Sequence, residues 1–467
     1  MEWIIWALIV VLGGLGLVLP TIDYIKETKV SPYLTLLGTA TALVLVLLLT
    51  FSRRSGILFD GALRIDTISS YLALIATLGA FLVSLASVTQ AKDWSTAPSL
   101  YSLLLLALLG VYFILFVNDA TVLVAAWALV AVASYVLVGV KKDEASLEAT
   151  TKYAIMGVAS SSLLIFGLAF VLGVTKVTQL APLTGVPDTY KLTLILGVMA
   201  LIAAFGFKLG VVPFHGWLPD VYGGAHPLVV SYVSGVIKLI SIGAFLRVLM
   251  PLIPAIASEW FLILAILSVI TMFYGNLAAL VQRNVQRMMA YSSIGHAGYF
   301  LIAFAALSFN EARTLALQGI GLHVTTYVLA KVGIFVGLAY LARKGVELTL
   351  DGMSGIGRKM PLTGTFFSLL LLSLMGMPPL IGFWSKFLYI FYSVVNVAPW
   401  LAFLGIVNSG ISVGYYAIVI RYLFFAEPPE LSIEEGNDPE LIVLAITATL
   451  GVIIGIGFVG AIASFLS

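Results

Sequence analysis

The chain has 467 residues, of which 61% are hydrophobic and 10% are charged, and its formal net charge at pH 7 is +2. Soluble proteins contain about 25% charged residues, so this composition excludes an ordinary water-soluble protein. Because apolar stretches run from end to end, it predicts an all-α polytopic membrane protein in a lipid bilayer. The small net charge excludes a nucleic-acid partner. The absence of cysteine excludes Fe–S clusters, disulfides and thiolate zinc sites, and we expect no cofactor.

Stretches of about 20 apolar residues, long enough to cross a bilayer, predict about fourteen transmembrane helices. In chain order they fall near 3–19, 32–51, 65–88, 100–117, 120–140, 151–173, 191–210, 227–249, 259–281, 289–307, 313–342, 362–391, 398–425 and 441–465. The short sequence VND at 117–119 separates the fourth span from the fifth.

Basic residues predict the orientation of these spans. The loops opposite the N-terminus collect more lysines and arginines, among them Lys141, Lys142, Arg343 and Lys344. By the positive-inside rule those loops are cytoplasmic, so the multi-pass chain is expected in the cell membrane with both termini outside. The acidic loop at 426–440 is then cytoplasmic; it is either a solvated loop or a docking segment for a partner subunit.

Four lysines fall inside predicted spans: Lys208, Lys238, Lys331 and Lys386. A charge at mid-membrane costs roughly 2.5–3.5 kcal/mol on insertion scales and usually marks an ion or proton path. The alternative is a lysine that extends its amine to the membrane surface, which fits the central positions of Lys238 and Lys331 poorly. A desolvated lysine can gain and lose a proton near neutral pH, so the four predict a proton relay.

Proline and glycine interrupt two spans close to such lysines. Pro213 follows Gly210 in the seventh span, and Pro378 and Pro379 precede Lys386 in the twelfth. Proline cannot donate a backbone hydrogen bond and breaks a helix, and a broken helix at membrane depth requires protein or water around it. Paired breaks five spans apart predict an ion path between repeats of inverted topology.

Four histidines accompany the lysines. His215 and His226 flank the first break, and His296 and His323 lie inside later spans. His323 and Lys331 are eight residues apart, about 80° around a helix and 12 Å along it, so both can line one polar face. The alternative for each histidine is a neutral ring with a satisfied hydrogen bond, and His215 is alternatively interfacial.

Three motifs carry a family resemblance: GFKLGVVPFHGWLPDVYGGAHP, NVQRMMAYSSIGHAGYF and MPPLIGFWSKF. Together they resemble the antiporter-like proton-pumping subunits of respiratory complex I, the N-type above all, with archaeal and hydrogenase-complex relatives and the Mrp antiporter D-type subunit. The resemblance implies fourteen helices, with discontinuous helices 7 and 12 and two inverted five-helix repeats over spans 4–8 and 9–13. It divides the chain into peripheral helices (1–99), a first repeat (100–249), a second repeat (259–425) and the acidic loop with the last helix (426–467).

The resemblance also assigns positions on a central chain of protonatable residues. Lys208 resembles the family's seventh-helix lysine, Lys238 the eighth-helix lysine and Lys331 the eleventh-helix lysine that follows a histidine. Lys386 resembles the terminal lysine of the twelfth helix, and His323 and His296 match further positions.

One departure from the family concerns the fifth helix, LVAAWALVAVASYVLVGV, where a glutamate is expected eleven residues before the glycine of LVG. Counting back from Gly139 leads to Ala128. Lys208 then has no obvious counter-charge in its own half, which puts the pumping competence of the chain in question.

The sequence therefore predicts a proton-translocating membrane-arm subunit of a complex I-like redox-driven pump of the NADH, ferredoxin, F420 or hydrogenase type. The expected partners are other antiporter-like and small membrane subunits, with hydrophilic Fe–S subunits as indirect partners that perform the redox chemistry. The alternative is a Na⁺/H⁺ antiporter subunit of the Mrp or hydrogenase and sulfur-reductase type. Sodium favours carboxylate and carbonyl ligands, and mid-span acids are missing, which favours protons. A structural spacer is a third interpretation, suggested by Ala128 and opposed by the four lysines.

Overall fold

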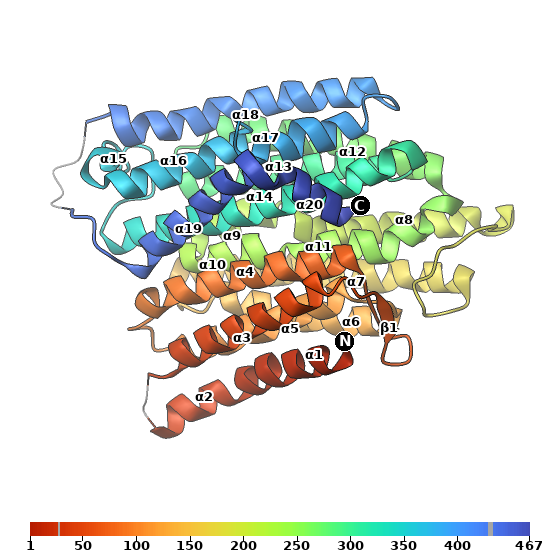
Figure 1. Cartoon of the computed structure of the whole chain (residues 1–467), viewed down its shortest axis with the longest axis horizontal. Coiled ribbons are helices and arrows are strands. Elements are labelled where there is room, and N and C mark those ends of the chain that lie inside the picture. The colour runs from red at the N-terminus through yellow and green to blue at the C-terminus, as the bar shows by residue number, and fades with distance from the viewer. Residues whose placement is uncertain (27–28, 428–432) are drawn as a thin grey trace.

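The computed structural model describes residues 1–26, 29–427 and 433–467. Most of them form helices that lie roughly side by side (Figure 1). The helices of the first part are α1 (Glu2–Leu8), α2 (Leu15–Lys26), α3 (Ser31–Phe51), α4 (Thr67–Gln90), α5 (Ala97–Leu115), α6 (Ala120–Val138), α7 (Glu144–Thr175) and α8 (Asp188–Leu209). The middle part contains α9 (Trp217–Gly224), α10 (Pro227–Tyr232), α11 (Leu239–Ala244), α12 (Ala257–Leu280), α13 (Val285–Ala306) and α14 (Asn310–Arg343).

The last part contains α15 (Ile356–Lys359), α16 (Pro361–Met375), α17 (Ile381–Phe383), α18 (Pro399–Phe425), α19 (Pro439–Ile453) and α20 (Val459–Leu466). Wider π-helical segments adjoin several of these helices: η1 (Ile9–Gly14), η2 (Val233–Ile237), η3 (Phe245–Leu249), η5 (Trp384–Phe391) and η6 (Ile454–Phe458). A 3₁₀ segment, η4 (Met250–Ala255), ends the span that begins with α10.

The prediction of a polytopic all-α membrane protein is confirmed. Within the described residues, twelve helices are long and apolar enough to cross a membrane. The two other predicted spans coincide with α13, which carries many polar residues, and with the shorter apolar helices α16 and α17–η5. Both termini lie at the same end of the helices, on the right in Figure 1, as an even number of spans requires. The predicted acidic loop at 426–440 falls partly outside the described residues, at 428–432.

Aspartates begin several of the spans. The carboxylates of Asp66, Asp119 and Asp143 each accept a hydrogen bond from a backbone N–H in the first turn of α4, α6 and α7, at 3.0, 2.8 and 2.8 Å. A carboxylate at this position satisfies free N–H groups and interacts favourably with the helix dipole. These acids therefore lie at span ends because they cap helices.

A small hairpin closes one end of the bundle and was not predicted. Strands β1 (Gly56–Leu58) and β2 (Leu63–Ile65) pair antiparallel, with Gly56 opposite Ile65. Backbone bonds join the hairpin to the α5–α6 connection, from Arg64 N–H to the Phe116 carbonyl at 2.7 Å and from Asn118 N–H to the Ala62 carbonyl at 3.0 Å. The hairpin thus holds the fourth and fifth spans at their shared end.

The core of the bundle consists of α14 and the span from α10 to η4. Every residue in the most apolar 18-residue stretch of Asn310–Arg343 is buried, as are 89% in that of Pro227–Ala255, against 33% for Glu2–Asp23. α14 packs against α4, α10, α13, α16, α19 and η5. The two innermost spans carry Lys238, His323 and Lys331, so these side chains begin at the centre of the protein.

Candidate functional site

All four lysines of the predicted spans are buried. Lys331 and Lys386 are 0% exposed, Lys208 is 2% exposed and Lys238 is 4% exposed. All four amines are enclosed by the protein, which argues against the alternative of lysines that extend along the protein surface to the interface. Their hydrogen bonds must therefore come from inside the protein.

The two predicted helix breaks share one backbone geometry. α8 ends at Gly210 (φ +89°) and α16 ends at Gly376 (φ +91°), both left-handed conformations that favour glycine. In each break, the N–H groups of the glycine and of the next residue both donate to the carbonyl four positions before the glycine. A proline with a cis peptide bond follows three positions later, Pro213 in the first break and Pro379, after Pro378, in the second. The breaks thus match position by position.

Lys208 lies in the last turn of α8 and bonds to hydroxyl groups. Its amine donates to Ser134 Oγ on α6 at 3.1 Å and to the Tyr153 hydroxyl on α7 at 2.9 Å. It also lies 4.4 Å from the ring centre of Tyr153 and 4.6 Å from that of Tyr135, where the ring faces attract a cation. Ala128, the position of the missing glutamate, lies on the exposed face of α6 instead. Hydroxyls and rings therefore surround this lysine.

Lys238 and Lys331 share one tyrosine. The amine of Lys238 donates to the Tyr327 hydroxyl at 3.1 Å and to the Ser293 carbonyl at 3.4 Å. The Tyr327 ring centre is 5.3 Å from the Lys238 amine and 5.7 Å from the Lys331 amine. Lys331 in turn donates to the Met289 carbonyl at 2.8 Å. Tyr327 thus lies between the two lysines.

An unbroken row of hydrogen bonds leads from Lys331 toward the twelfth span. It runs from Lys331 Nζ to Ser292 Oγ (2.9 Å), to the Tyr416 hydroxyl (2.6 Å), to His296 Nε2 (3.2 Å), from His296 Nδ1 to His323 Nε2 (3.0 Å), and from His323 Nδ1 to Ser385 Oγ (3.0 Å). We call these six residues the polar chain. They come from α13, α14, α18 and η5, and all six are buried.

Lys386 follows Ser385 directly but has other partners. Its amine donates to the carbonyls of Leu374 and Met375 at 2.9 and 2.7 Å and to Ser409 Oγ at 2.8 Å. The two carbonyls belong to the last turn of α16 and are left free by the break at Gly376. We call these three oxygens the oxygen seat.

The structure does not place the other two histidines with the lysines. His215, in the first break, packs its ring against Tyr274, with 4.4 Å between ring centres. His226 precedes α10, and its Nδ1 accepts from Leu228 N–H at 3.2 Å. Burial, and to a lesser degree Lys141, lowers the pKa of His226 to about 3, so its ring is neutral at physiological pH.

Sequence reasoning missed the hydroxyl groups that connect the site: Ser134, Tyr153, Ser292, Tyr327, Ser385, Ser409 and Tyr416. A signal was present for two of them. Tyr327 lies four residues after His323 and four before Lys331, and Ser292 lies four before His296. Residues four apart share a helix face. Ser385 directly precedes Lys386 but bonds to His323 instead. The remaining four lie on helices that are distant in sequence from their lysine or histidine partners, and no local spacing points to them.

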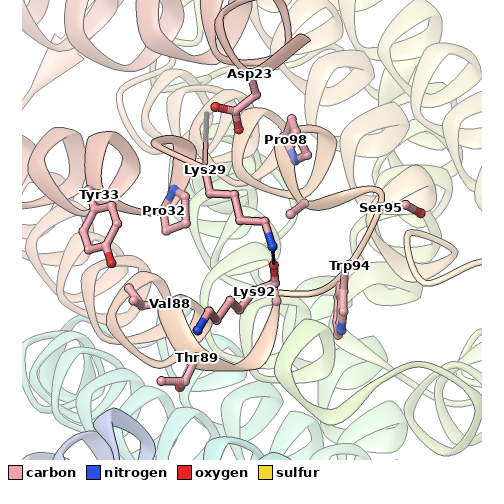
Figure 2. Close-up of a pocket in the computed structure, with 12 residues that line it drawn as sticks. Asp23, Lys29, Pro32, Tyr33, Val88, Thr89, Lys92, Trp94, Ser95 and Pro98 are labelled. Atoms are coloured by element: carbon pink, nitrogen blue, oxygen red, sulfur yellow. Dashed lines mark hydrogen bonds between the residues drawn. The ribbon is translucent and has the colours of Figure 1, made fainter. Parts of the chain in front are cut away.

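Pockets lie at the edges of the bundle. Figure 2 shows one of about 430 Å³ between the start of α3 and the α4–α5 connection, where Lys29 donates to the Lys92 carbonyl at 3.3 Å. A second, also of about 430 Å³, is lined by His226, Gln286 and Arg343 among others. Neither includes a residue of the polar chain. Within the described part of the chain, no group of three or more His, Asp or Glu side chains could hold a metal ion.

Comparisons with known proteins agree with this architecture. The family model described as NADH:quinone oxidoreductase/Mrp antiporter, TM, matches residues 117–412. The chain is 32% identical over 451 residues to the F(420)H(2) dehydrogenase subunit N of Methanosarcina mazei, covering 92% of this chain and 90% of that one. It is 30% identical over 452 residues to the NADH-quinone oxidoreductase subunit N of Rhodospirillum rubrum, covering 94% and 92%.

Solved structures of membrane complexes contain chains with a similar fold. A chain of respiratory complex I from Thermus thermophilus superposes with a TM-score of 0.84 at 28% identity, covering 98% of this chain and 99% of that one. A chain of the archaeal membrane-bound sulfane sulfur reductase has a TM-score of 0.90 at 22% identity, covering 99% and 96%. A chain of the Mrp complex from Dietzia sp. has a TM-score of 0.86 at 18% identity, covering 99% and 96%. At these last two identities the likeness concerns the fold.

Proposed function

The chain belongs to the NADH:quinone oxidoreductase/Mrp antiporter transmembrane family, and from this premise we propose that it is a proton-translocating membrane-arm subunit of a complex I-like redox-driven pump. The observation that carries the proposal is the polar chain, which joins Lys331 to Ser385 through direct hydrogen bonds in the buried centre of the protein. The pumping of protons requires such a connection between titratable groups.

The groups of the polar chain suit proton transfer. A hydroxyl both donates and accepts, and a neutral imidazole donates with one nitrogen and accepts with the other. A proton arriving at one nitrogen of His296 can therefore leave from the other. Because Lys238 and Lys331 contact the same Tyr327 ring, a charge on one disfavours a charge on the other. Protonation of Lys238 thus favours release of a proton from Lys331 into the polar chain.

The pocket lined by His226, Gln286 and Arg343 supports the entry of protons into the protein from the side that carries Lys141 and the end of α14. We assign this side to the cytoplasm, because basic residues gather there, and both termini to the outside of the cell membrane. The matched breaks support two inverted repeats at 100–249 and 259–425, flanked by peripheral helices at 1–99 and the segment 426–467.

The partners follow from the relatives, two of which are subunits N of an F(420)H(2) dehydrogenase and of an NADH-quinone oxidoreductase. We assign this chain to an assembly with other membrane-arm subunits, and with hydrophilic Fe–S subunits that carry out the electron transfer. The exposed face of α6 around Ala128 is a candidate contact for a neighbouring membrane subunit. Proton transport is favoured over sodium transport, because the buried ionisable groups of the site are lysines and histidines, whereas sodium prefers oxygen ligands.

The test is the Lys238→Met substitution in the intact membrane complex, compared with Lys176→Met at the exposed end of α7. Protons moved per electron are measured in sealed vesicles with a pH-sensitive dye. Lys238→Met is expected to lower this ratio while electron transfer continues, and Lys176→Met is expected to leave it unchanged. The same ratio in Lys238→Met as in the parent complex would contradict the proposal.

A further inference from the structure

The oxygen seat matches the charged form of lysine. An ammonium group has three N–H donors and no acceptor, whereas a neutral amine has two donors and a lone pair. The Lys386 amine faces three oxygen acceptors at 2.7, 2.8 and 2.9 Å. The carbonyls of Leu374 and Met375 lie at the C-terminal end of α16, where the helix dipole favours a positive charge. The seat therefore stabilises the ammonium group over the amine.

The seat also keeps Lys386 off the polar chain. The chain ends at Ser385 Oγ, which bonds to His323 Nδ1 and donates to the Gly382 carbonyl at 3.2 Å. Among the described residues, no hydrogen bond joins Lys386 to any member of the chain. Lys386 and Ser385 are neighbours in sequence on η5, yet their side chains have separate partners. The route through direct hydrogen bonds is interrupted at this one step.

In the first break, a carbonyl one position before those that match the oxygen seat has a different partner. There the Trp217 indole N–H donates to the Phe207 carbonyl, near the end of α8, at 2.7 Å. An indole N–H is neutral and fixed on a rigid ring, whereas the amine of Lys386 can take up a proton and is carried by four flexible methylene groups. The end of the first broken helix thus has a fixed neutral donor beside it, whereas the end of the second holds a movable amine.

Resting on the proposed function, we propose that Ser409 and the free carbonyl end of α16 act as a latch, which holds the charged Lys386 away from the polar chain. A proton that reaches Lys386 is retained there, because an ammonium group whose three donors are occupied does not return its proton to His323. The lysine exchanges with the polar chain only after its amine leaves the seat. Ser409 is then a positioning residue that acts through Lys386.

Few other titratable or charged groups lie close enough to Lys386 to change its protonation. Tyr299 on α13 faces it with its ring centre 5.4 Å from the amine, and His296 on α13 and His323 on α14 are the other nearby titratable groups. From α16 and α18 the described contacts are the two carbonyls and Ser409. No carboxylate of the described residues bonds to Lys386. Ser409 Oγ also donates to the Met375 carbonyl at 3.4 Å, so a change at Ser409 alters both the oxygen seat and the lysine that it holds.

The experiment measures proton pumping by the intact complex between pH 6 and pH 10 with Ser409→Ala, Ser409→Thr and a control. The control is Ser412→Ala on the same helix, whose hydroxyl donates to the Ser409 carbonyl at 2.6 Å and not to Lys386. With one acceptor removed, Lys386 loses its proton more readily. The alkaline limb of the Ser409→Ala profile is therefore expected to move down by about one to two pH units. Ser409→Thr, which retains a hydroxyl, and Ser412→Ala are expected to keep the parent profile.

Two results would overturn the latch. One is a Ser409→Ala profile equal to that of the parent, and the other is a loss by the same factor at every pH that threonine does not restore. Lys386→Met separates this inference from the proposed function. An unchanged proton-to-electron ratio in Lys386→Met contradicts the path through this lysine, whereas a lowered ratio combined with a parent-like Ser409→Ala contradicts the latch alone.

Discussion

Each buried lysine of this protein is satisfied by hydroxyls, carbonyls and aromatic rings. Lys208 has Ser134 and Tyr153, and Lys331 has Ser292 and a carbonyl. A carboxylate paired with a buried ammonium group would stabilise its charge strongly, and the lysine would release its proton with difficulty. Neutral oxygens stabilise the charge less, so the lysine can lose its proton. The chemistry of the partners therefore suits groups that change charge during turnover.

Tyr416 is the link of the polar chain that substitution tests most directly. Tyr416→Phe removes the hydroxyl between Ser292 and His296, and we expect proton translocation to fall by about tenfold or more. The control is Tyr101→Phe, a buried tyrosine on α5 whose hydroxyl donates to the Ser87 carbonyl at 2.9 Å and which contacts no member of the chain. Vesicle acidification at a fixed rate of electron transfer measures both. Equal values for the two variants would refute the role of Tyr416.

Two tyrosines beside Lys208, Tyr153 and Tyr135, allow a second comparison of a substitution with its control. Tyr153→Phe keeps the ring over the amine but removes one hydrogen-bond acceptor, whereas Tyr135 contacts the amine through its ring. A hydrogen bond to a charged group contributes about 1.5–3 kcal/mol, so Tyr153→Phe should reduce the ratio of charged to neutral Lys208 by roughly tenfold or more. We expect fewer protons moved per electron in Tyr153→Phe and little change in Tyr135→Phe. A larger effect at Tyr135 would show that the ring contact dominates.

At the scale of elements, the two helix breaks and α14 arrange the site. The break at Gly376 frees the carbonyls of Leu374 and Met375, which accept from Lys386, and beside the break at Gly210 the Phe207 carbonyl accepts from Trp217. α14 presents His323, Tyr327 and Lys331 in one row, four residues apart, toward α13 and η5. The breaks provide acceptors, and the unbroken helix provides the groups that titrate.

Glycine at 376 is required by both its backbone and its surroundings. A Cβ there would lie 2.8 Å from Lys386 Cε in a left-handed conformation, which costs other residues about 1–2 kcal/mol. Gly376→Ala should therefore lower the stability of the purified complex by at least that amount. Gly410→Ala on α18, with no atom within 4 Å of the new Cβ, should be neutral or slightly stabilising. Thermal unfolding in detergent compares them; equal midpoints would contradict the expectation.

The sequence was informative where one residue type forces a local structure. Pro213 and Pro379 located both breaks, and the mid-span lysines located the site, because a charge at membrane depth is costly and usually belongs to an ion or proton path. Ser409 and Tyr416 could not be found in this way. Both lie on α18, and their partners lie on α13, η5 and the end of α16, so only the packing of distant helices brings them together. The hairpin at 56–65 was missed because three-residue strands carry little periodic signal.

At the scale of the whole molecule, the ion pairs of the described residues lie at the ends of the helices. Arg247 bonds Asp66 at 2.6 Å and the carbonyls of Leu115 and Arg64 at 2.9 Å, which joins the fourth and eighth spans to the hairpin. At the other end Arg343 bonds Glu440 at 3.0 Å and Asp438 at 2.8 Å. The charges that fix the helices to each other thus lie apart from the charges that titrate in the middle.

The pair at Asp66 makes a prediction about acid stability. Burial raises the pKa of Asp66, but the charge of Arg247 and hydrogen bonds from Arg247 and Ser69 outweigh it, so this pKa lies below its ordinary value. A carboxylate with a lowered pKa stabilises the fold above the unfolded-state pKa and loses this contribution as pH falls through the folded value. Unfolding midpoints should therefore decrease below about pH 4.

Asp66→Asn is expected to cost about 1–3 kcal/mol at neutral pH and to remove this part of the acid sensitivity. The control is Asp351→Asn, whose partner Arg283 is 64% exposed, because exposed ion pairs contribute about 0–1 kcal/mol. Midpoints in detergent between pH 3 and pH 7 compare the two. The expectation fails if Asp66→Asn keeps the full acid sensitivity of the parent.

Because His296 and His323 bond to each other directly, the passage of one proton would reverse the direction of the hydrogen bonds in the polar chain. When a proton passes through a neutral imidazole, the ring hydrogen moves from one nitrogen to the other, and every hydroxyl in the row is left pointing the opposite way. A second proton cannot follow until both rings have exchanged tautomers again and the hydroxyls of Ser292, Tyr416 and Ser385 have turned. On the proposed path, the row therefore carries one proton per cycle, and its resetting sets an upper limit on the rate of transport.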